Sequence, residues 1–376
     1  MKRLKALIKM ELKPALLIGV YFLLIDFFVL LNIRGQIQGT WRNFLLNGIR
    51  DFILYNRGIR VADTLIASML YTMLFSIVGM MALVYGSFKN DKSIEIGRFL
   101  KSLPYTMRER CLVKMGVGIV TFTLTYIVYA IGMLVLHTSY LNKFSEIYTV
   151  TIFSEVYHQI FDRGELIKGL MLVYVGCIAI YLFCMMFQYL VSNRLGGIIV
   201  AVLVYLSPVF IMNSLSAHVG VRYTNAIYEN IIYPITEWLN ELMIIFLYQG
   251  YGRIATTADI AEDSIASYSY MNLTGYRMIF YGMMILISLI AILKLCVAER
   301  VEKSDYFIPS KCFRSIFICG VTVCGGLLLG DLYLIFSNQT NMGIVYGLIT
   351  FGGIISFLVA RKIASIGMRK GKEVRI

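Results

Sequence analysis

Charged residues are scarce in this chain of 376 residues, at 15% of the sequence, and proline and tryptophan are scarcer, with 5 and 2 copies. A soluble globular protein carries about 25% charged residues, so this composition leaves too little polar surface to shield an apolar core from water. Hydrophobic residues make up 59% of the sequence, and the mean hydropathy is +0.74. The chain is therefore expected to fold within a lipid bilayer.

Side chains and motifs that carry out common chemistry are also missing. The three histidines, His137, His158 and His218, are far apart in the sequence, and no HExxH or GxSxG motif is present. The cysteines form no CxxC pair, so neither a metal site nor a disulfide framework is indicated. The GxxxxGK[ST] phosphate loop is absent as well, which gives the chain no visible means of hydrolysing ATP itself. We expect no cofactor in this chain.

Long apolar runs dominate what remains, and a membrane helix needs about 17 to 25 mostly apolar residues. Eight runs are long enough, which predicts an all-α, polytopic membrane helix bundle of about eight spans. The runs cover residues 14–33, 64–88, 115–136, 170–191, 195–211, 278–297, 315–336 and 343–360. The glycine-rich stretches within the last two runs indicate close packing of spans seven and eight.

The distribution of Lys and Arg predicts the orientation of the bundle. With the N-terminus inside, the inner segments carry more than twice as many Lys and Arg as the outer segments. Basic residues in short loops resist translocation, so both ends of the chain are expected on the cytoplasmic side. The net charge of +13 is then a topology signal and a contact with lipid headgroups, and nucleic acid is not needed to explain it.

The segments outside the spans have distinct characters. Residues 1–13 combine one apolar helical face with five basic residues, which predicts an amphipathic elbow helix in the membrane surface ahead of Pro14. The outer segments 34–63 and 137–168 are polar, and the outer loop 212–277 is the largest. Its residues 230–251 are too interrupted to span, so they are expected to dip into the interface or pack over the bundle. Residues 298–314 form an inner loop and 361–376 a basic inner tail.

The inner segment 88–114 is the strongest candidate for function. It carries seven basic residues between two apolar runs, and Leu103 and Pro104 interrupt it. Because a residue before proline is disfavoured in helical backbone, residues 94–101 and 106–114 are expected to form two short helices around a tight turn. The simpler interpretation is a solvated loop that only fixes the topology.

The same segment resembles the ABC-2 type permeases, the membrane subunits of bacterial ATP-binding-cassette exporters. The resemblance rests on a loop of the kind F-x-x-D-x(5)-G-x-x-L-x-S-L-P-x-[ST], followed by a lysine before the next span. The matching positions are Phe88, Asp91, Gly97, Leu100, Ser102, Leu103, Pro104, Thr106 and Lys114. The family often has a basic residue three positions after the proline, where this chain has Met107 and then Arg108. Two spans beyond a six-span core resemble a Gram-positive subgroup of the family.

This resemblance implies a function and a set of partners. The permease would lie in a bacterial plasma membrane and pair with a second copy or a similar permease. A separate ATPase subunit, which binds ATP and Mg²⁺, would dock on the loop. The residues expected to contact that ATPase are Glu95, Gly97, Arg98, Leu103, Pro104, Arg108 and Glu109, and Arg110 could pair with it too.

Asp26 lies in the middle of the first predicted span. An acid there costs roughly 2.5 to 3.5 kcal/mol on insertion scales, so it is expected to face protein or water. It is a candidate for the substrate path, and the alternative is a structural hydrogen bond from a Tyr or Ser on a neighbouring span. Asp331 and Lys294, near the ends of their spans, are weaker candidates.

Two other classes of protein share many of these features. One is an integral membrane enzyme that acts on lipid or envelope precursors through Asp26 and the outer loops. The other is a membrane sensor or scaffold whose outer loop recognises a ligand. The substrate and the direction of transport have no signature in the sequence.

Overall fold

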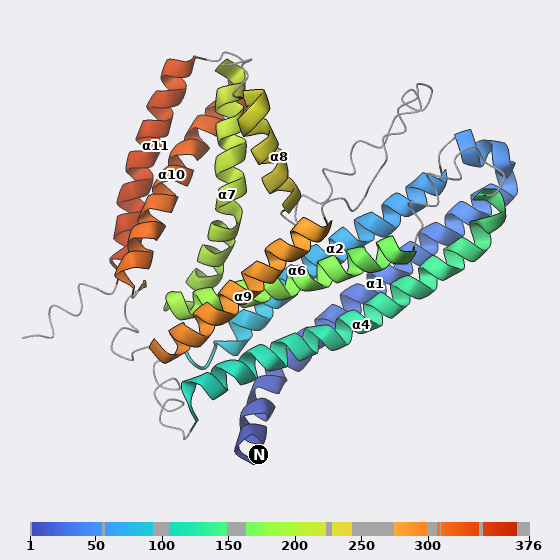
Figure 1. Cartoon of the computed structure of the whole chain (residues 1–376), viewed down its shortest axis with the longest axis horizontal. Coiled ribbons are helices and arrows are strands. Elements are labelled where there is room, and N and C mark those ends of the chain that lie inside the picture. Colours follow the sequence, from blue (N-terminus) through green and yellow to red (C-terminus); the bar gives the residue numbers. More distant parts are fainter. Residues whose placement is uncertain are drawn as a thin grey trace, which may run out of the picture. The chain divides into compact units, whose positions relative to one another are not determined.

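The computed structural model describes residues 2–54, 57–92, 105–148, 163–222, 228–242, 274–298, 307–308, 310–337 and 341–366. Over these residues all the regular structure is helical, as the apolar runs predict (Figure 1). The long helices are α1 (Lys2–Leu54), α2 (Arg57–Ser87), α4 (Met107–Tyr148), α6 (Arg163–Leu190), α7 (Arg194–Arg222), α9 (Thr274–Ala298), α10 (Lys311–Phe336) and α11 (Met342–Ala364). A π-helical turn, Tyr228–Ile232, leads into the short helix α8 (Tyr233–Leu242).

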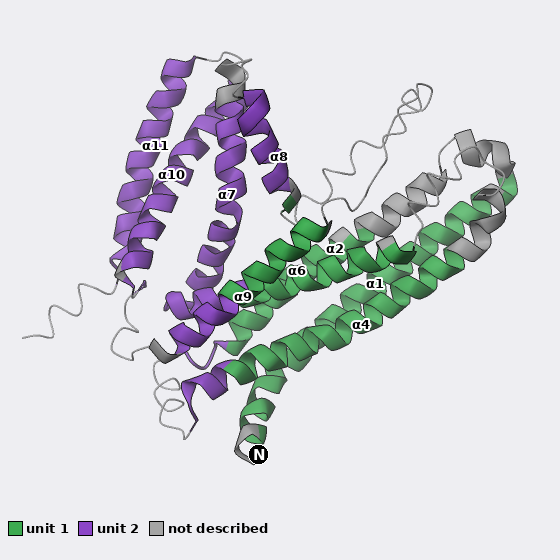
Figure 2. Cartoon of the chain, viewed as in Figure 1, with its two compact units in different colours: residues 1–87, 112–182, 241–287 green, residues 88–111, 183–240, 288–376 purple. Residues whose placement is uncertain are grey.

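The helices divide into two compact units, coloured separately in Figure 2. Unit 1 comprises Met1–Ser87, Leu112–Leu182 and Glu241–Ile287, and unit 2 comprises Phe88–Cys111, Phe183–Asn240 and Ser288–Ile376. Unit 1 therefore contains α1, α2, most of α4 and α6, and the first half of α9. Unit 2 contains the start of α4, the end of α6, the second half of α9, most of α8, and all of α7, α10 and α11.

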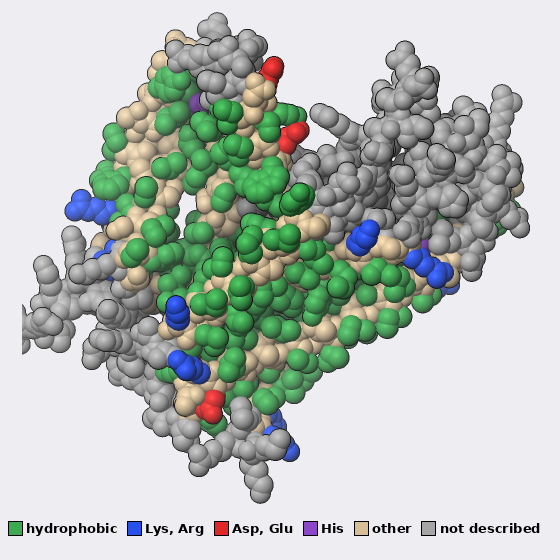
Figure 3. Space-filling model, in the orientation of Figure 1, with side chains coloured by type: hydrophobic (Ala, Val, Ile, Leu, Met, Phe, Trp, Pro, Cys, Tyr) green, Lys and Arg blue, Asp and Glu red, His purple; other side chains and the backbone are tan. Residues whose placement is uncertain are grey.

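Seven of the described helices are long and apolar enough to cross a membrane, so the chain is a multi-pass membrane protein. Six of them contain a predicted span in full, and α6 contains the predicted span 170–191 except for its last residue. The remaining prediction, residues 64–88, falls on α2, whose apolar part within the described residues is Tyr71–Ser87. The helices in Figure 3 present mostly hydrophobic side chains to the outside, as lipid contact requires.

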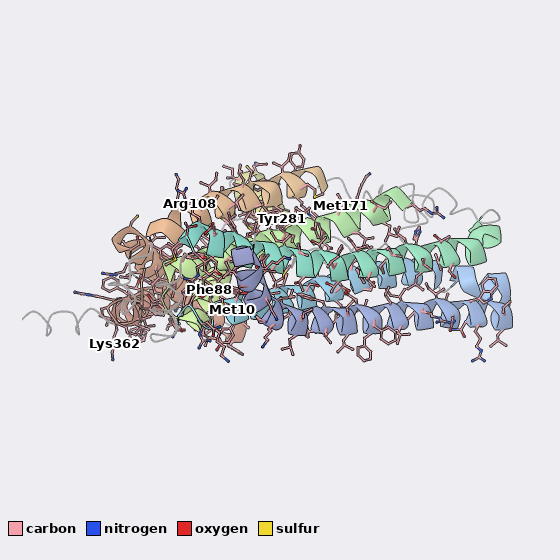
Figure 4. All side chains as sticks on the ribbon, turned by 90° about the horizontal axis from the view of Figure 1, so that it is seen from below. Met10, Phe88, Arg108, Met171, Tyr281 and Lys362 are labelled. Atoms are coloured by element: carbon pink, nitrogen blue, oxygen red, sulfur yellow. The ribbon has the colours of Figure 1, made fainter. Side chains whose placement is uncertain are left out.

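Helix α1 is much longer than a membrane is thick. Its 53 residues extend about 80 Å, whereas the hydrocarbon core is about 30 Å across. Pro14 lies inside the helix, and Figure 1 shows the N-terminal part at an angle to the rest, with Met10 marking this part in Figure 4. One face of α1 is buried at regular intervals, through Leu7, Glu11, Ala15, Phe22, Asp26, Ile33 and Ile37.

The prediction of polar outer loops was largely wrong. Residues 34–63 are not a loop: α1 continues to Leu54, and α2 begins at Arg57. Likewise α4 continues to Tyr148 and α7 to Arg222, so the predicted outer segments 137–168 and 212–277 both begin as helix. Polar residues end an apolar run without ending a helix, and hydropathy cannot distinguish the two cases. Residues 255–270 of the predicted loop 212–277 lie outside the described residues.

Within unit 2, α8 packs against the C-terminal half of α7. The amides of Asn213 and Asn240 exchange two hydrogen bonds, of 3.0 and 3.1 Å, and the Thr236 hydroxyl donates to the Met212 carbonyl at 3.5 Å. Trp238 on the same short helix remains 49% exposed. The prediction that residues 230–251 do not span is consistent with this ten-residue helix.

Helix α7 tolerates a proline in its interior. Pro208 cannot donate a hydrogen bond to the carbonyl of Val204, four residues earlier. The neighbouring Ser207 hydroxyl donates to that carbonyl instead, at 3.0 Å. The helix therefore continues through the proline for 29 residues, beyond the predicted span 195–211.

The close packing predicted for the last two spans is present between α10 and α11. A Cβ atom on Gly325 would lie 2.0 Å from the Ser356 hydroxyl, and one on Gly352 would lie 2.9 Å from the Gly325 carbonyl oxygen. The backbones approach so closely that no side chain fits between them.

Candidate functional site

The predicted docking residues lie only partly within the described structure. Glu95, Gly97, Arg98, Leu103 and Pro104 fall in residues 93–104, outside it, as does the predicted short helix 94–101. Arg108 and Glu109 are described, and both are exposed in the first turn of α4, where Figure 4 labels Arg108. The predicted short helix 106–114 is not a separate element, because α4 runs on without a break to Tyr148.

A capping box begins α4. The Thr106 hydroxyl accepts from the Glu109 backbone N–H at 3.2 Å, and the Glu109 carboxylate accepts from the Thr106 N–H at 2.8 Å. These reciprocal bonds satisfy donors that the first turn of a helix leaves without partners. Glu109 therefore has a structural role in fixing where α4 starts.

Behind this cap, a buried ion pair closes the 88–114 segment on itself. The Arg110 guanidinium lies 2.7 Å from the Asp91 carboxylate, and the arginine side chain is 6% exposed. Arg110 is thus engaged inside unit 2 and not directed at solvent, contrary to the expectation that it could pair with a partner. Asp91, one of the residues that carry the family resemblance, has a clear structural role here.

Two further contacts fix the beginning of the segment to the end of α6. The Lys92 ammonium donates to the carbonyls of Gln188 and Val191, the carbonyls that a helix C-terminus leaves unpaired. The Phe88 ring, 2% exposed, packs edge-to-face on Tyr189 with centroids 5.2 Å apart. Phe88, Asp91 and Lys92 together hold the first residues of the segment in place.

In unit 1, a second buried ion pair joins α4 to α1. The Lys114 ammonium lies 3.1 Å from the Glu11 carboxylate, with side chains 1% and 6% exposed, and it also donates to the Ser87 carbonyl at the end of α2. The Tyr181 hydroxyl on α6 donates to the Lys114 carbonyl at 3.1 Å. This hydroxyl reaches α4 only because Gly118 has no Cβ, which would otherwise lie 2.1 Å from it. Four helices therefore meet at Lys114.

We call the contacts of Asp91 with Arg110 and of Lys92 with the α6 carbonyls the loop clamp, and those of Lys114 with Glu11 and Ser87 the four-helix junction. Buried charges are costly unless they are paired, so both groups resist separation.

Asp26 is buried, 6% exposed, on the same face of α1 as Glu11. It faces protein, as expected for an acid within a span. Unlike Glu11, it has no basic partner: the buried ion pairs of the described residues do not include it. The hydroxyls of Tyr126 and Tyr129 and the thiol of Cys177 lie within electrostatic range of its carboxyl group.

A further polar group joins the C-terminal halves of α7 and α10. The Asp331 carboxylate accepts from the Ser214 hydroxyl at 2.9 Å and lies 3.3 Å from His218 Nδ1, which is 2.7 Å from the Ser214 carbonyl. Because the serine hydroxyl points to the carboxylate and not to the imidazole, it is not activated as a nucleophile. Lys294 is exposed on α9 and takes no part in any of these groups.

Sequence reasoning missed the partners of the residues that it identified. Glu11 and Tyr181 were not singled out, and only tertiary packing brings them to Lys114. The capping box had a visible signal, because Thr106-Met-Arg-Glu109 matches the S/T-x-x-E pattern. Among the described residues, no group of three or more His, Cys, Asp or Glu side chains is placed to hold a metal ion.

Comparison with protein-family models, curated proteins and solved structures finds no match to this chain. The argument for its function therefore rests on the residues and their geometry.

Proposed function

We propose that this chain is the permease subunit of an ATP-binding-cassette transporter of a bacterial plasma membrane, with both ends in the cytoplasm. A separate ATPase subunit would bind the 88–114 segment and drive transport, in the direction of export. The permease would act as a pair, with a second copy or a similar chain. The N-terminal part of α1, before Pro14, would lie in the inner membrane surface.

The observation that carries this proposal is the anchoring of the 88–114 segment at its described ends. Phe88, Asp91 and Lys92 fix its beginning in unit 2. Its end is the first part of α4, which is held by the four-helix junction in unit 1. A loop that only fixed the topology would need basic charge but neither buried ion pairs nor lysine-capped carbonyls.

Energy transfer from a partner requires such an arrangement. The chain has no phosphate loop, so ATP hydrolysis would have to occur in another subunit. Closure of that subunit could move a membrane helix only through a contact that does not yield. Arg108 is the exposed basic side chain at the start of α4, a helix of 42 residues, and we propose it as a docking contact.

Site-directed cross-linking tests the docking role. Cys312 and Cys319 are exposed and would react, so both are first replaced by serine. Arg108→Cys is then introduced into this background, and Lys362→Cys, an exposed basic residue at the end of α11, provides the matched control.

A bifunctional maleimide applied to membranes is expected to join the Arg108→Cys chain to a protein that contains a phosphate loop, with a yield that changes when ATP is added. The Lys362→Cys chain should give little of this product. Equal yields from the two positions, or no ATPase captured from either, would contradict docking on this segment.

A further inference from the structure

Asp26 lies at the level where polar residues of three other helices converge in unit 1. Three contacts fix the register of α1 against α4: Gly19 faces Thr121, Phe22 packs edge-to-face on Phe122 with centroids 5.4 Å apart, and Leu30 faces Gly132. Since both helices rise by the same amount per residue, Asp26 lies level with residues 126–129 of α4.

The register of α1 against α2 shows which residue of α2 lies level with Asp26. The Tyr21 hydroxyl donates to the Phe75 carbonyl at 3.2 Å, and Gly79 lies against the rings of Tyr21 and Phe22. The two helices run in opposite directions, so Asp26 lies near Thr72, one turn beyond Phe75. Figure 1 shows α1, α2 and α4 running alongside one another in this part of unit 1.

The hydroxyls at this level are buried and not fully used. Tyr129 and Thr72 are both 0% exposed, and neither hydroxyl has a hydrogen-bond partner of normal geometry. They lie beside each other, with the Ser68 hydroxyl also within reach of Tyr129. Buried polar groups in a membrane are normally satisfied, so two incompletely bonded hydroxyls next to an acid indicate a missing ligand.

Among the residues that the structure describes, no basic side chain pairs with Asp26 at this level. Asp26 contributes a carboxylate on α1, while the titratable groups facing it are Tyr126 and Tyr129 on α4 and Cys177 on α6, all neutral in their ordinary state. The contribution of α2 consists of the uncharged Ser68 and Thr72. A single positive charge would neutralise the acid, and carboxylate and hydroxyl oxygens are ligands that hard cations prefer.

We propose that Asp26, with the hydroxyls of Thr72 and Tyr129, forms a site for one monovalent cation, bound as Na⁺ or as a proton. The site lies inside a membrane-spanning bundle, where cation-coupled transporters also place theirs. The inference does not depend on the transporter function proposed above, because the site would stabilise the folded chain whatever the chain does.

Thermal unfolding of the purified full chain in detergent micelles tests the proposal. The melting temperature is measured while NaCl replaces N-methyl-D-glucamine chloride at constant ionic strength, and separately while the pH is lowered without Na⁺. A cation that binds only the folded state raises the melting temperature as its concentration increases. A response to Na⁺ identifies the ion as the ligand. A response to pH without one to Na⁺ identifies the proton only if Asp26→Asn removes it, because the other carboxylates of the chain also take up protons as the pH falls.

Three variants make the result specific to the site. Asp26→Asn should abolish the response while melting no lower than the wild type in the absence of Na⁺, because it removes a buried charge of nearly the same shape. Tyr129→Phe should retain the response with its midpoint moved about tenfold higher, since one oxygen ligand is lost. Asp331→Asn, which changes a carboxylate in unit 2, should respond as the wild type does.

A wild-type melting temperature that is independent of both Na⁺ and pH would overturn the proposal. An Asp26→Asn variant that responds as the wild type does would overturn it as well. Both results are obtained without any ATPase, so they are separate from the outcome of the cross-linking experiment.

Discussion

Replacing Lys114 by methionine is expected to destabilise the chain strongly, because it leaves the Glu11 carboxylate buried without its partner. The two charged groups are 3.1 Å apart, and at an effective dielectric constant of about 20 their attraction is about 5 kcal/mol. Desolvation offsets much of that value when the pair forms. Breaking a buried pair from one side nevertheless costs about 3 to 5 kcal/mol, since the remaining charge is uncompensated.

The double variant Glu11→Gln with Lys114→Met separates the ion pair from other effects of each substitution. It should be less destabilised than the sum of the two single variants, by about 2 kcal/mol or more, because it leaves no buried charge behind. Lys9→Met is the matched control: Lys9 is exposed on the same helix as Glu11, and its loss should change the free energy of unfolding by less than about 0.5 kcal/mol.

Reversible unfolding in mixed micelles, with the denaturing detergent titrated and followed by circular dichroism, gives these free energies. The reasoning would be refuted if Lys114→Met behaved like Lys9→Met. It would also be refuted if the effects of the two single substitutions simply added in the double variant, because the charges would then not be coupled.

Two other predictions concern the packing of α10 on α11 and the cap of α4. Gly325→Ala should lower the free energy of unfolding by about 1 to 3 kcal/mol, because its Cβ would lie 2.0 Å from the Ser356 hydroxyl. Gly347→Ala, with nothing within 4 Å of the added Cβ, should be neutral or slightly stabilising. Detergent unfolding of both variants checks this prediction, and equal effects would contradict the close packing of α10 on α11. Glu109→Ala should lower the free energy of unfolding by about 1 kcal/mol through loss of the capping box. Glu109→Gln should retain most of this free energy, because the glutamine amide oxygen also accepts from the Thr106 N–H. Equal loss in both variants would show that the carboxylate acts through its charge and not through the cap.

The apolar helices could be predicted from the sequence, and their polar extensions could not. Partitioning into lipid depends on summed side-chain hydropathy, so each apolar run marks a helix without knowledge of its neighbours. Gly35 and Gly39 and the polar residues around them resemble a loop in composition, yet α1 continues through them to Leu54. What holds a polar helix is packing outside its own sequence, which hydropathy does not report.

For each contact of the candidate site, the sequence identified one of the two residues and not the other. The family resemblance included Asp91 and Lys114, and the cost of a charge within a span drew attention to Asp26. Their counterparts lie between 19 and 103 positions away along the chain: Arg110 for Asp91, Glu11 for Lys114, and the hydroxyls of Thr72 and Tyr129 for Asp26. Nothing in a linear pattern of charge states which of the many Lys and Glu residues will meet after folding.

The unbroken course of α1 has a consequence for how the protein can change over evolutionary time. Glu11 and Asp26 lie on one buried face of a single helix, about four turns apart. Removing one residue between them would rotate one acid by about 100° relative to the other and turn it from protein towards lipid. Descendants of this chain can therefore exchange the lipid-facing residues between the two acids freely, but they cannot gain or lose a residue there without separating the four-helix junction from Asp26.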